Sequence, residues 1–199
     1  MTWLILAVLL WGVLHSLLAS NGVKEFFYRT FGGGFRRGYR LLYNLFAVFS
    51  FLPILYLMMI LPDRILYQVP APFDGLMRLG QGISLMLLFV AVLQTDLLSF
   101  AGLRQVFEAE KRGPLMTGGL YRYVRHPLYA FSLLTLWLAP TMSLNSFIVY
   151  LAFTIYILIG IVFEERKLLH EFGVEYARYR SVTPMLIPAV KPVRAAPKN

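Results

Sequence analysis

Residues 127–163 read PLYAFSLLTLWLAPTMSLNSFIVYLAFTIYILIGIVF, and this stretch decides the fold because it holds 37 consecutive residues without a charged side chain. As a single α-helix it would be about 55 Å long, whereas a helix that crosses a membrane needs about 20 residues. Residues 139–146, with the sequence APTMSLNS, have the composition of a turn. We therefore predict a helical hairpin, with a short first arm over 127–139 and a full second arm over 143–163.

The rest of the chain has the same apolar character. Of its 199 residues, 58% are apolar and 15% are charged, whereas a soluble domain has about 25% charged residues. Three further apolar segments, namely 2–19, 41–61 and the stretch between Arg78 and Arg104, are long enough to cross a bilayer. These features predict an all-α polytopic membrane protein with five transmembrane segments, the last two forming the hairpin. Spaced apolar residues over 164–180 predict a C-terminal amphipathic helix on the cytoplasmic side.

The charged residues predict the orientation. The chain has 19 basic and 10 acidic residues, a net charge of +9. All the basic residues except Arg64 and Arg78 lie in 20–40, in 102–126 or after residue 163. By the positive-inside rule these segments are cytoplasmic, with 20–40 expected as a loop between the first two spans that is flexible at Gly32-Gly33-Gly34. The rule places the N-terminus outside and the C-terminus inside. The same rule accounts for the basic excess without a nucleic-acid partner. Met1-Thr2 offers no basic region, so a cleaved signal peptide is not expected.

The polar residues that could bind a ligand or take part in a reaction lie at the two ends of the hairpin. Arg125 and His126 precede the first arm, and Glu164 and Glu165 follow the second. A hairpin brings its ends together, so these side chains should face one another. Pro127 suits the first helical position, and the backbone N–H groups after it form an anion site. Both groups also have an interpretation without a ligand. The basic residues before the first arm could form a turn that contacts lipid phosphates, and the two glutamates could be ordinary charge on a helix surface.

Together, these groups suit one particular small ligand. They offer donors for a carboxylate and acceptors for hydroxyls or an ammonium. The rings of Tyr121, Tyr123 and Tyr129 offer aromatic faces for a cation. S-adenosylmethionine has a carboxylate, an ammonium, a ribose and a sulfonium. The chain has no cysteine, which excludes disulfides, a thiolate nucleophile and Cys-based metal sites; no metal site is predicted.

Two stretches of fixed spacing resemble the isoprenylcysteine carboxyl methyltransferase and phospholipid methyltransferase superfamily. They are GLYRYVRHPLY at 119–129 and the pattern EExxLxxxFGxxYxxY at 164–179. Within that superfamily, WLAPTM at 137–142 and LQTD at 93–96 are similar to the bacterial methanethiol S-methyltransferase and NnrU-like branch. The resemblance is strongest over 113–188.

The resemblance implies an integral membrane methyltransferase that uses S-adenosylmethionine, located in the bacterial inner membrane. It implies a single domain over 1–199, in which a three-span part (1–112) precedes the cofactor-binding region (113–188) and a loose basic tail (189–199). It also implies a set of cofactor contacts, in which Leu115 and Met116 border the adenosine. The set is Leu115, Met116, Tyr121, His126, Pro127, Leu128, Tyr129 and Glu164.

The methyl acceptor is expected to be small or lipophilic, and membrane lipids are expected as neighbours. The isoprenylcysteine enzymes carry an arginine where this chain has Gly160, which argues against a prenylated cysteine. A thiol is favoured, because His126 and the two glutamates are the only bases beside the motif and a thiol needs little help in losing its proton. No residue is assigned as catalytic.

Some residues keep two interpretations. Arg125 is interpreted as structural, through an ion pair with one of the glutamates. His15, Asp96 and Glu165 are candidate substrate residues. Asp96 has the alternative of a partner for Asn44, Gln94 or an arginine. His15 has the alternatives of an interhelical hydrogen bond or haem ligation.

The whole chain likewise has two rival functions. One is a haem-binding isomerase or redox module, because the NnrU-like branch also resembles membrane carotenoid isomerases. The other is a non-catalytic membrane scaffold.

Overall fold

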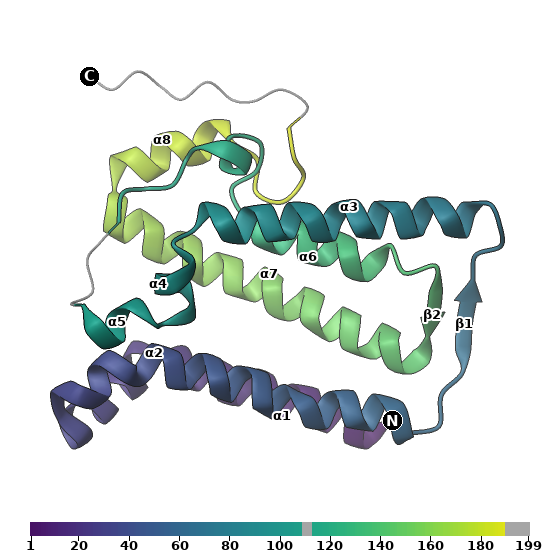
Figure 1. Ribbon diagram of the computed structural model, residues 1–199, viewed down its shortest axis with the longest axis horizontal. Coiled ribbons are helices and arrows are strands. Elements are labelled where there is room, and N and C mark those ends of the chain that lie inside the picture. Colours follow the sequence, from purple (N-terminus) through teal and green to yellow (C-terminus); the bar gives the residue numbers. More distant parts are fainter. Residues whose placement is uncertain (109–112, 190–199) are drawn as a thin grey trace. The chain divides into compact units, whose positions relative to one another are not determined.

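The computed structural model describes residues 1–108 and 113–189, which are mostly helical (Figure 1). Within these residues four helices are long and apolar enough to cross a membrane: Thr2–Ala19, Gly34–Ile60, Phe73–Gln94 and Leu144–Phe172. The prediction of a helical membrane protein is therefore confirmed. The first arm of the hairpin forms α6 (Pro127–Trp137), which has 11 residues. It is about 16 Å long, short of a hydrocarbon core of about 30 Å.

The described chain divides into two compact units that alternate along the sequence. The first unit comprises Met1–Leu66, 96–108 and Met142–Ala152. The second comprises Tyr67–Thr95, Gly113–Thr141 and 153–189. α7 (Leu144–Phe172) begins in the first unit and ends in the second.

Two short strands were not expected in an all-α protein. β1 (Ile65–Gln68) and β2 (Thr141–Ser143) form a two-stranded sheet. β2 occupies the turn between α6 and α7, so the predicted break near residues 139–146 is confirmed. Most of the other described residues are helical, as predicted.

In the first unit α1 (Thr2–Ala19) packs along α2 (Asn21–Ile60). The Tyr39 hydroxyl of α2 donates to the backbone carbonyl of Leu18, at 2.6 Å, and Tyr39 is almost fully buried. This bond ties the C-terminal end of α1 to α2.

The segment 20–40, interpreted from its glycines and charges as a loop, is helical, so that interpretation was wrong. The Ser20 side chain caps α2 by accepting a hydrogen bond from the Val23 backbone N–H. Rings at helical spacing stack along the segment; they belong to Phe27, Phe31 and Phe35. Among the three consecutive glycines, Gly32 interrupts the helix, with φ 76° and ψ −168°, a backbone conformation that glycine adopts readily.

The third predicted span was too long at its C-terminal end. α3 (Phe73–Gln94) stops at Gln94. Two short helices follow, α4 (Leu97–Ala101) and α5 (Arg104–Phe107). Polar capping explains the early end, because Asp96 caps α4 through the backbone N–H and hydroxyl of Ser99. A carboxylate that can cap a new helix favours a break over continuation.

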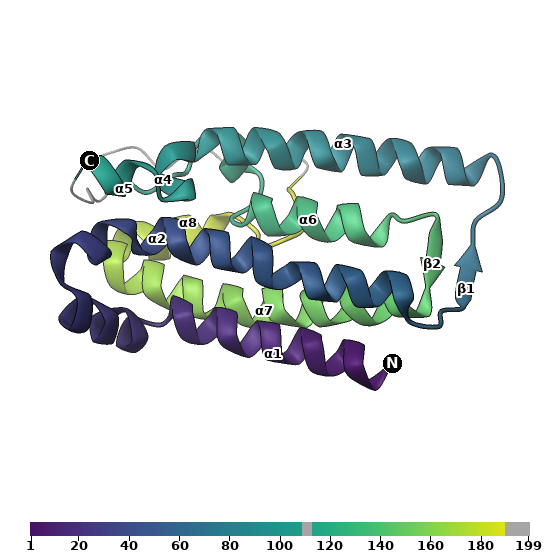
Figure 2. The ribbon, with the colours of Figure 1, turned by 60° about the horizontal axis from the view of Figure 1, so that its bottom comes forward.

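In the second unit α3 packs against α6, as Figure 2 shows. The Gln81 side-chain amide donates to the Thr135 carbonyl at 2.9 Å. The Trp137 indole N–H at the end of α6 donates to the Thr154 hydroxyl of α7 at 2.9 Å. The two arms of the hairpin therefore run side by side, as predicted.

The helix predicted over 164–180 is divided differently in the structure. α7 continues without a break to Phe172, Gly173 turns the chain with φ 53°, and α8 (Val174–Val182) follows. The predicted start at residue 164 was wrong, because the appearance of charge ends an apolar run without ending a helix. Of the predicted basic tail, only Ala189 is described; residues 190–199 lie outside the described residues, as do the basic Lys111 and Arg112.

Candidate functional site

The two ends of the hairpin meet in a buried ion pair. The Arg125 guanidinium contacts the Glu165 carboxylate, with Nε and Nη2 lying 2.8 Å and 2.6 Å from Oε1. Both side chains are 9% exposed. His126 joins the pair through Nε2, which is 3.3 Å from the same oxygen. The juxtaposition expected from the hairpin is confirmed, and it places Arg125 in the expected ion pair.

Residues of α8 and the turn after it complete this cluster, and the sequence did not predict their contribution. Arg180 of α8 lies with Nε 3.3 Å from Glu165 Oε2. Arg125 Nη1 also donates to the backbone carbonyls of Arg180 and Thr183. Glu165 therefore has partners on three sides, Arg125, His126 and Arg180. The only sequence signal for the third partner was a basic residue on the predicted C-terminal helix.

Residues after α8 also pair with the motif through the backbone. The Arg125 N–H donates to the Pro184 carbonyl at 2.8 Å, and the His126 N–H donates to the Met185 carbonyl at 3.2 Å. The Ala189 N–H donates in turn to the Tyr123 carbonyl at 2.8 Å. We call residues 183–189 the strap, because they hold the motif in place by backbone hydrogen bonds. Nothing in their composition predicted this pairing.

Glu164 differs from its neighbour Glu165. Its side chain is 42% exposed, yet Oε2 is shielded from solvent and forms no hydrogen bond with any described residue. The nearest basic nitrogen is His126 Nδ1, at 3.8 Å. The Tyr129 hydroxyl interacts with the same carboxylate, and the Tyr129 ring stacks on the His126 ring with centroids 5.6 Å apart. A shielded acceptor with spare capacity is a place where a ligand donor can bind.

The phenols around the two glutamates keep their protons. Burial, and then the Glu164 carboxylate, raise the pKa of Tyr121. Burial, and then Glu165, raise the pKa of Tyr176 to about 12. Burial also raises the pKa of Tyr179, whose hydroxyl donates to the Tyr121 carbonyl at 2.7 Å. At neutral pH these side chains are therefore hydrogen-bond donors and uncharged aromatic surfaces, and they do not act as bases.

The remaining predicted cofactor contacts belong to the same unit. Pro127 is the first residue of α6 and is almost fully buried, directly after His126. Leu128 is half-buried in the first turn of α6. Leu115, half-buried, and Met116, exposed, lie in the irregular segment before the 3₁₀ helix η1 (Gly119–Arg122). These four residues therefore lie in the same unit as Arg125, His126 and the two glutamates.

The turn before η1 depends on one glycine. Gly119 has φ +56°, and a Cβ at this position would lie 2.5–2.6 Å from three side-chain atoms of Gln94. Gln94 Oε1 accepts a hydrogen bond from the Leu120 backbone N–H at 2.9 Å. The glycine therefore allows the end of α3 to hold the loop that leads to the motif. The sequence contained both residues in recognised motifs but did not indicate that they touch.

We expect Gly119→Ala to destabilise the protein by about 1–3 kcal/mol, because alanine is strained at positive φ and would displace Gln94. The measurement is thermal unfolding of the detergent-purified protein. Gly118→Ala is the matched control, since Gly118 has φ −91° and open space around it. It should lie within about 0.5 kcal/mol of the parent protein. Equal stability of the two variants would contradict the described turn.

The other two candidate substrate residues belong to the first unit. His15 of α1 is hydrogen-bonded through Nε2 to the Tyr43 hydroxyl of α2 at 2.6 Å, and its ring stacks on Trp11 with centroids 4.7 Å apart. This is the interhelical hydrogen bond that was one of the alternatives for His15. Asp96 pairs with Arg104 at 3.2 Å, and its side chain is 42% exposed. An arginine was one of the alternative partners for Asp96, but the burial that this alternative implied is not found.

Within the described residues, no group of three or more His, Asp or Glu side chains could hold a metal ion. What the hairpin ends offer is an electrostatic anchor around Glu165 and, next to it, an acceptor on Glu164 flanked by tyrosines. These features define a helical membrane protein with a polar site at the ends of two antiparallel helices.

The chain belongs to the NnrU family, whose model, described as NnrU protein, matches residues 3–195. It is similar to "Methanethiol S-methyltransferase 2" of Bradyrhizobium diazoefficiens, at 42% identity over 106 residues, covering 50% of this chain and 40% of that protein. It is also similar to "Methanethiol S-methyltransferase" of Crocosphaera subtropica, at 43% identity over 94 residues, covering 45% and 37%. The protein of the same name from Pseudomonas deceptionensis is 34% identical over 110 residues, covering 53% and 42%.

The matches thus span about two fifths of the length of these relatives. No solved structure matches the chain. The resemblance to the methanethiol S-methyltransferase and NnrU-like branch is confirmed.

Proposed function

We propose that this protein is an integral membrane methyltransferase that uses S-adenosylmethionine and methylates a small or lipophilic thiol. The observation that carries the proposal is the shielded Oε2 of Glu164, which lies beside His126 and tyrosines. The similarity to proteins named methanethiol S-methyltransferase supports the reaction class.

The residues at the hairpin ends fit S-adenosylmethionine. Glu164 Oε2 would accept a hydrogen bond from a hydroxyl or the ammonium group of the cofactor. The first-turn N–H groups of Leu128 and Tyr129 would donate to its carboxylate. The Tyr121 ring, which stays uncharged, and the Tyr129 ring would stabilise a neighbouring sulfonium. We place the adenosine against Leu115 and Met116.

Orientation is the main contribution that the chain makes to the reaction. S-adenosylmethionine would supply a methyl group that already carries its leaving group. Because Glu165 is occupied by Arg125, His126 and Arg180, we assign it to anchoring the site rather than to substrate binding. Fixing the ends of α6 and α7 in this way orients Glu164 and excludes water, which is where such enzymes gain rate.

The acceptor follows from the same side chains. An amine or hydroxyl acceptor must lose a proton, and a thiol, whose ordinary pKa is lower, loses its proton more easily. The tyrosines beside the glutamates have raised pKa values and cannot take that proton. Gly160 supplies no cation for the carboxylate of a prenylated cysteine. The side chains around the two glutamates therefore favour a thiol as the methyl acceptor.

We further propose that residues 1–199 act as one membrane domain with five membrane segments, α6 entering the bilayer without crossing it fully. The basic residues place the N-terminus outside and the C-terminus in the cytoplasm of a bacterial inner membrane. The site would then receive the water-soluble cofactor from the cytoplasm and an apolar acceptor from the lipid.

The test is a methyl-transfer assay on the purified protein with radiolabelled S-adenosylmethionine and a panel of methanethiol, longer alkanethiols and phospholipids. We expect transfer to at least one thiol and none to the phospholipids. In parallel, the absorption spectrum of the protein purified from haem-replete cells is recorded. A stoichiometric Soret band that His15→Ala abolishes, together with no transfer to any acceptor, would overturn the proposal in favour of a haem protein.

A further inference from the structure

The first eleven residues of α2, residues 21–31, form an amphipathic helix, which we call the elbow helix. It lies at the beginning of α2 and precedes the bend at Gly32 (Figure 1). At 100° per residue, the apolar residues and one threonine share a side. That side carries Val23, Phe26, Phe27, Thr30 and Phe31, and the opposite side carries Asn21, Lys24, Glu25, Tyr28 and Arg29.

The apolar side of the elbow helix is largely uncovered. Phe26 is 65% exposed and Phe31 is 58% exposed. Ordinary soluble surfaces rarely leave two large rings of one helix face so open. The rings stack within the elbow helix, since Phe27 contacts Phe26 and Phe31, but that stacking leaves their outer surfaces exposed.

The elbow helix joins directly to a candidate membrane span. The helical geometry breaks at Gly32, and the apolar span Gly34–Ile60 begins two residues later. So short a connection would place the elbow helix at the surface of a bilayer that this span crosses. The span's first turns carry Arg36 and Arg37, both exposed, and the Arg36 guanidinium lies 5.4 Å from the centre of the Tyr28 ring. This contact links the polar side of the elbow helix to the start of the span.

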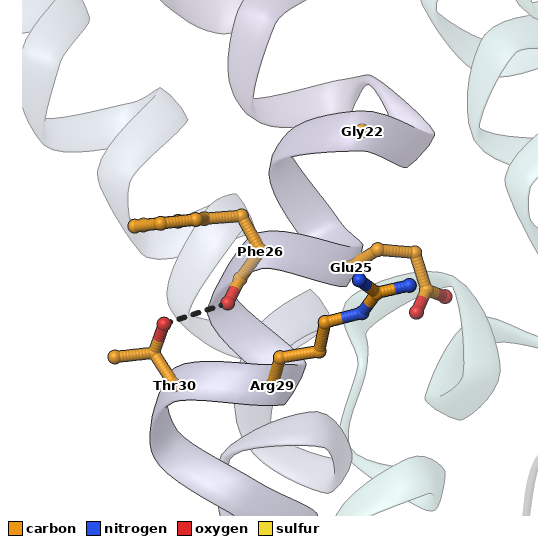
Figure 3. Close-up of a pocket in the computed structure, with 5 residues that line it drawn as sticks. All are labelled: Gly22, Glu25, Phe26, Arg29 and Thr30. Carbon is orange, nitrogen blue, oxygen red and sulfur yellow. Dashed lines mark hydrogen bonds between the residues drawn. The ribbon is translucent and has the colours of Figure 1, made fainter.

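Basic residues strongly outnumber acidic residues in the elbow helix and the start of the span. Residues 21–40 contain Glu25 as their one acidic residue, against five basic residues: Lys24, Arg29, Arg36, Arg37 and Arg40. Gly22, Glu25, Phe26, Arg29 and Thr30 line an open depression where the two sides of the elbow helix meet. Figure 3 shows the Phe26 ring on one side and the charged ends of Glu25 and Arg29 on the other.

We propose that the elbow helix is an interfacial helix that binds anionic phospholipids of the leaflet beside it. Phe26 and Phe31 would insert at the boundary between head groups and acyl chains, and Arg29, Arg36 and Arg37 would pair with lipid phosphates. An apolar face opposite a basic face is the pattern of helices that lie in this plane. The occupant is lipid because the exposed rings continue directly into a membrane span and the charge is basic. This inference is independent of the proposed enzymatic function.

Spin labels on single cysteines test the depth of the helix, because the parent chain has no cysteine. Phe26→Cys, Phe31→Cys and Glu25→Cys are labelled in the full-length protein and reconstituted in nanodiscs of phosphatidylcholine with phosphatidylglycerol. We expect labels at positions 26 and 31 to be several-fold more accessible to oxygen than to an aqueous nickel reagent, and the label at 25 to show the reverse. Equal aqueous accessibility at 25 and 26 would overturn the proposal, as would labels shielded from both reagents, which indicate a protein partner.

Lipid retention tests the charge. The variant Arg29→Gln/Arg36→Gln/Arg37→Gln is compared with the control Arg64→Gln/Arg78→Gln, which removes basic residues elsewhere. Each basic residue at an anionic surface contributes about fivefold to binding. We therefore expect the first variant to retain phosphatidylglycerol at least tenfold less well than the parent, with phosphatidylcholine unchanged and the control like the parent. Equal losses in both variants, or no loss in either, would contradict specific binding at the elbow helix.

Discussion

Arg125→Leu should lower the free energy of unfolding by about 3–5 kcal/mol, the largest stability loss that we expect from any single substitution in the site. Arg125 and Glu165 are each 9% exposed, and removing one partner of a buried ion pair leaves the other charge uncompensated. Arg125 also donates to the carbonyls of Arg180 and Thr183, so the strap would lose an attachment as well. For a chain of this size, the melting temperature in detergent should fall by on the order of 10 °C.

Arg180→Leu is the matched control for this prediction. Arg180 contacts the same carboxylate, but its side chain is 50% exposed, and exposed ion pairs contribute about 0–1 kcal/mol. The double variant Arg125→Leu/Glu165→Leu should lose less stability than the sum of the two single variants, because no charge is left buried without its main partner. A melting temperature of Arg125→Leu within 2–3 °C of the parent, about 1 kcal/mol, would show that the pair is not the anchor of the hairpin.

Glu164→Gln should weaken the binding of S-adenosylmethionine by about 10-fold to 150-fold while leaving the melting temperature close to that of the parent. Hydrogen bonds to charged groups contribute about 1.5–3 kcal/mol, and the substitution removes the charge from the acceptor without changing its size. Stability should change little, because the Glu164 side chain is 42% exposed and the structural ion pair belongs to Glu165. Equilibrium dialysis with radiolabelled cofactor gives the affinity.

Glu171→Gln is the control for that variant. Glu171 lies on the same helix, two turns further along, and its side chain is exposed. It should bind the cofactor as the parent does. If Glu164→Gln bound as tightly as Glu171→Gln, the shielded Oε2 of Glu164 would have no part in the site.

The sequence predicted the hairpin and its ion pair because both depend on local signals. A charge-free run too long for one crossing, with a turn inside it, requires two arms, and charges at both ends must then meet. On that reasoning alone, Arg125 could be paired with one of the two glutamates. The choice of Glu165 over Glu164 as the buried partner depends on how α7 is rotated, which residue spacing does not determine.

The parts that the sequence did not predict depend on contacts between distant segments or on weak local signals. The strap reaches Arg125 and His126 through backbone hydrogen bonds, which leave no pattern in side-chain type. The contact of Gly119 with Gln94 joins two motifs that were recognised separately. The elbow helix was missed because three glycines and several charges resemble a loop, although only Gly32 leaves the helical conformation.

Photolabelling tests most directly whether the hairpin ends bind S-adenosylmethionine. The purified parent protein is irradiated with cofactor radiolabelled on its methyl group, digested, and its labelled peptides are identified by mass spectrometry. We predict saturable labelling in peptides that contain residues 113–129 or 156–165, suppressed by excess unlabelled cofactor. Saturable labelling confined to residues 1–66, or no saturable labelling of a folded protein, would contradict a cofactor site at the ends of α6 and α7.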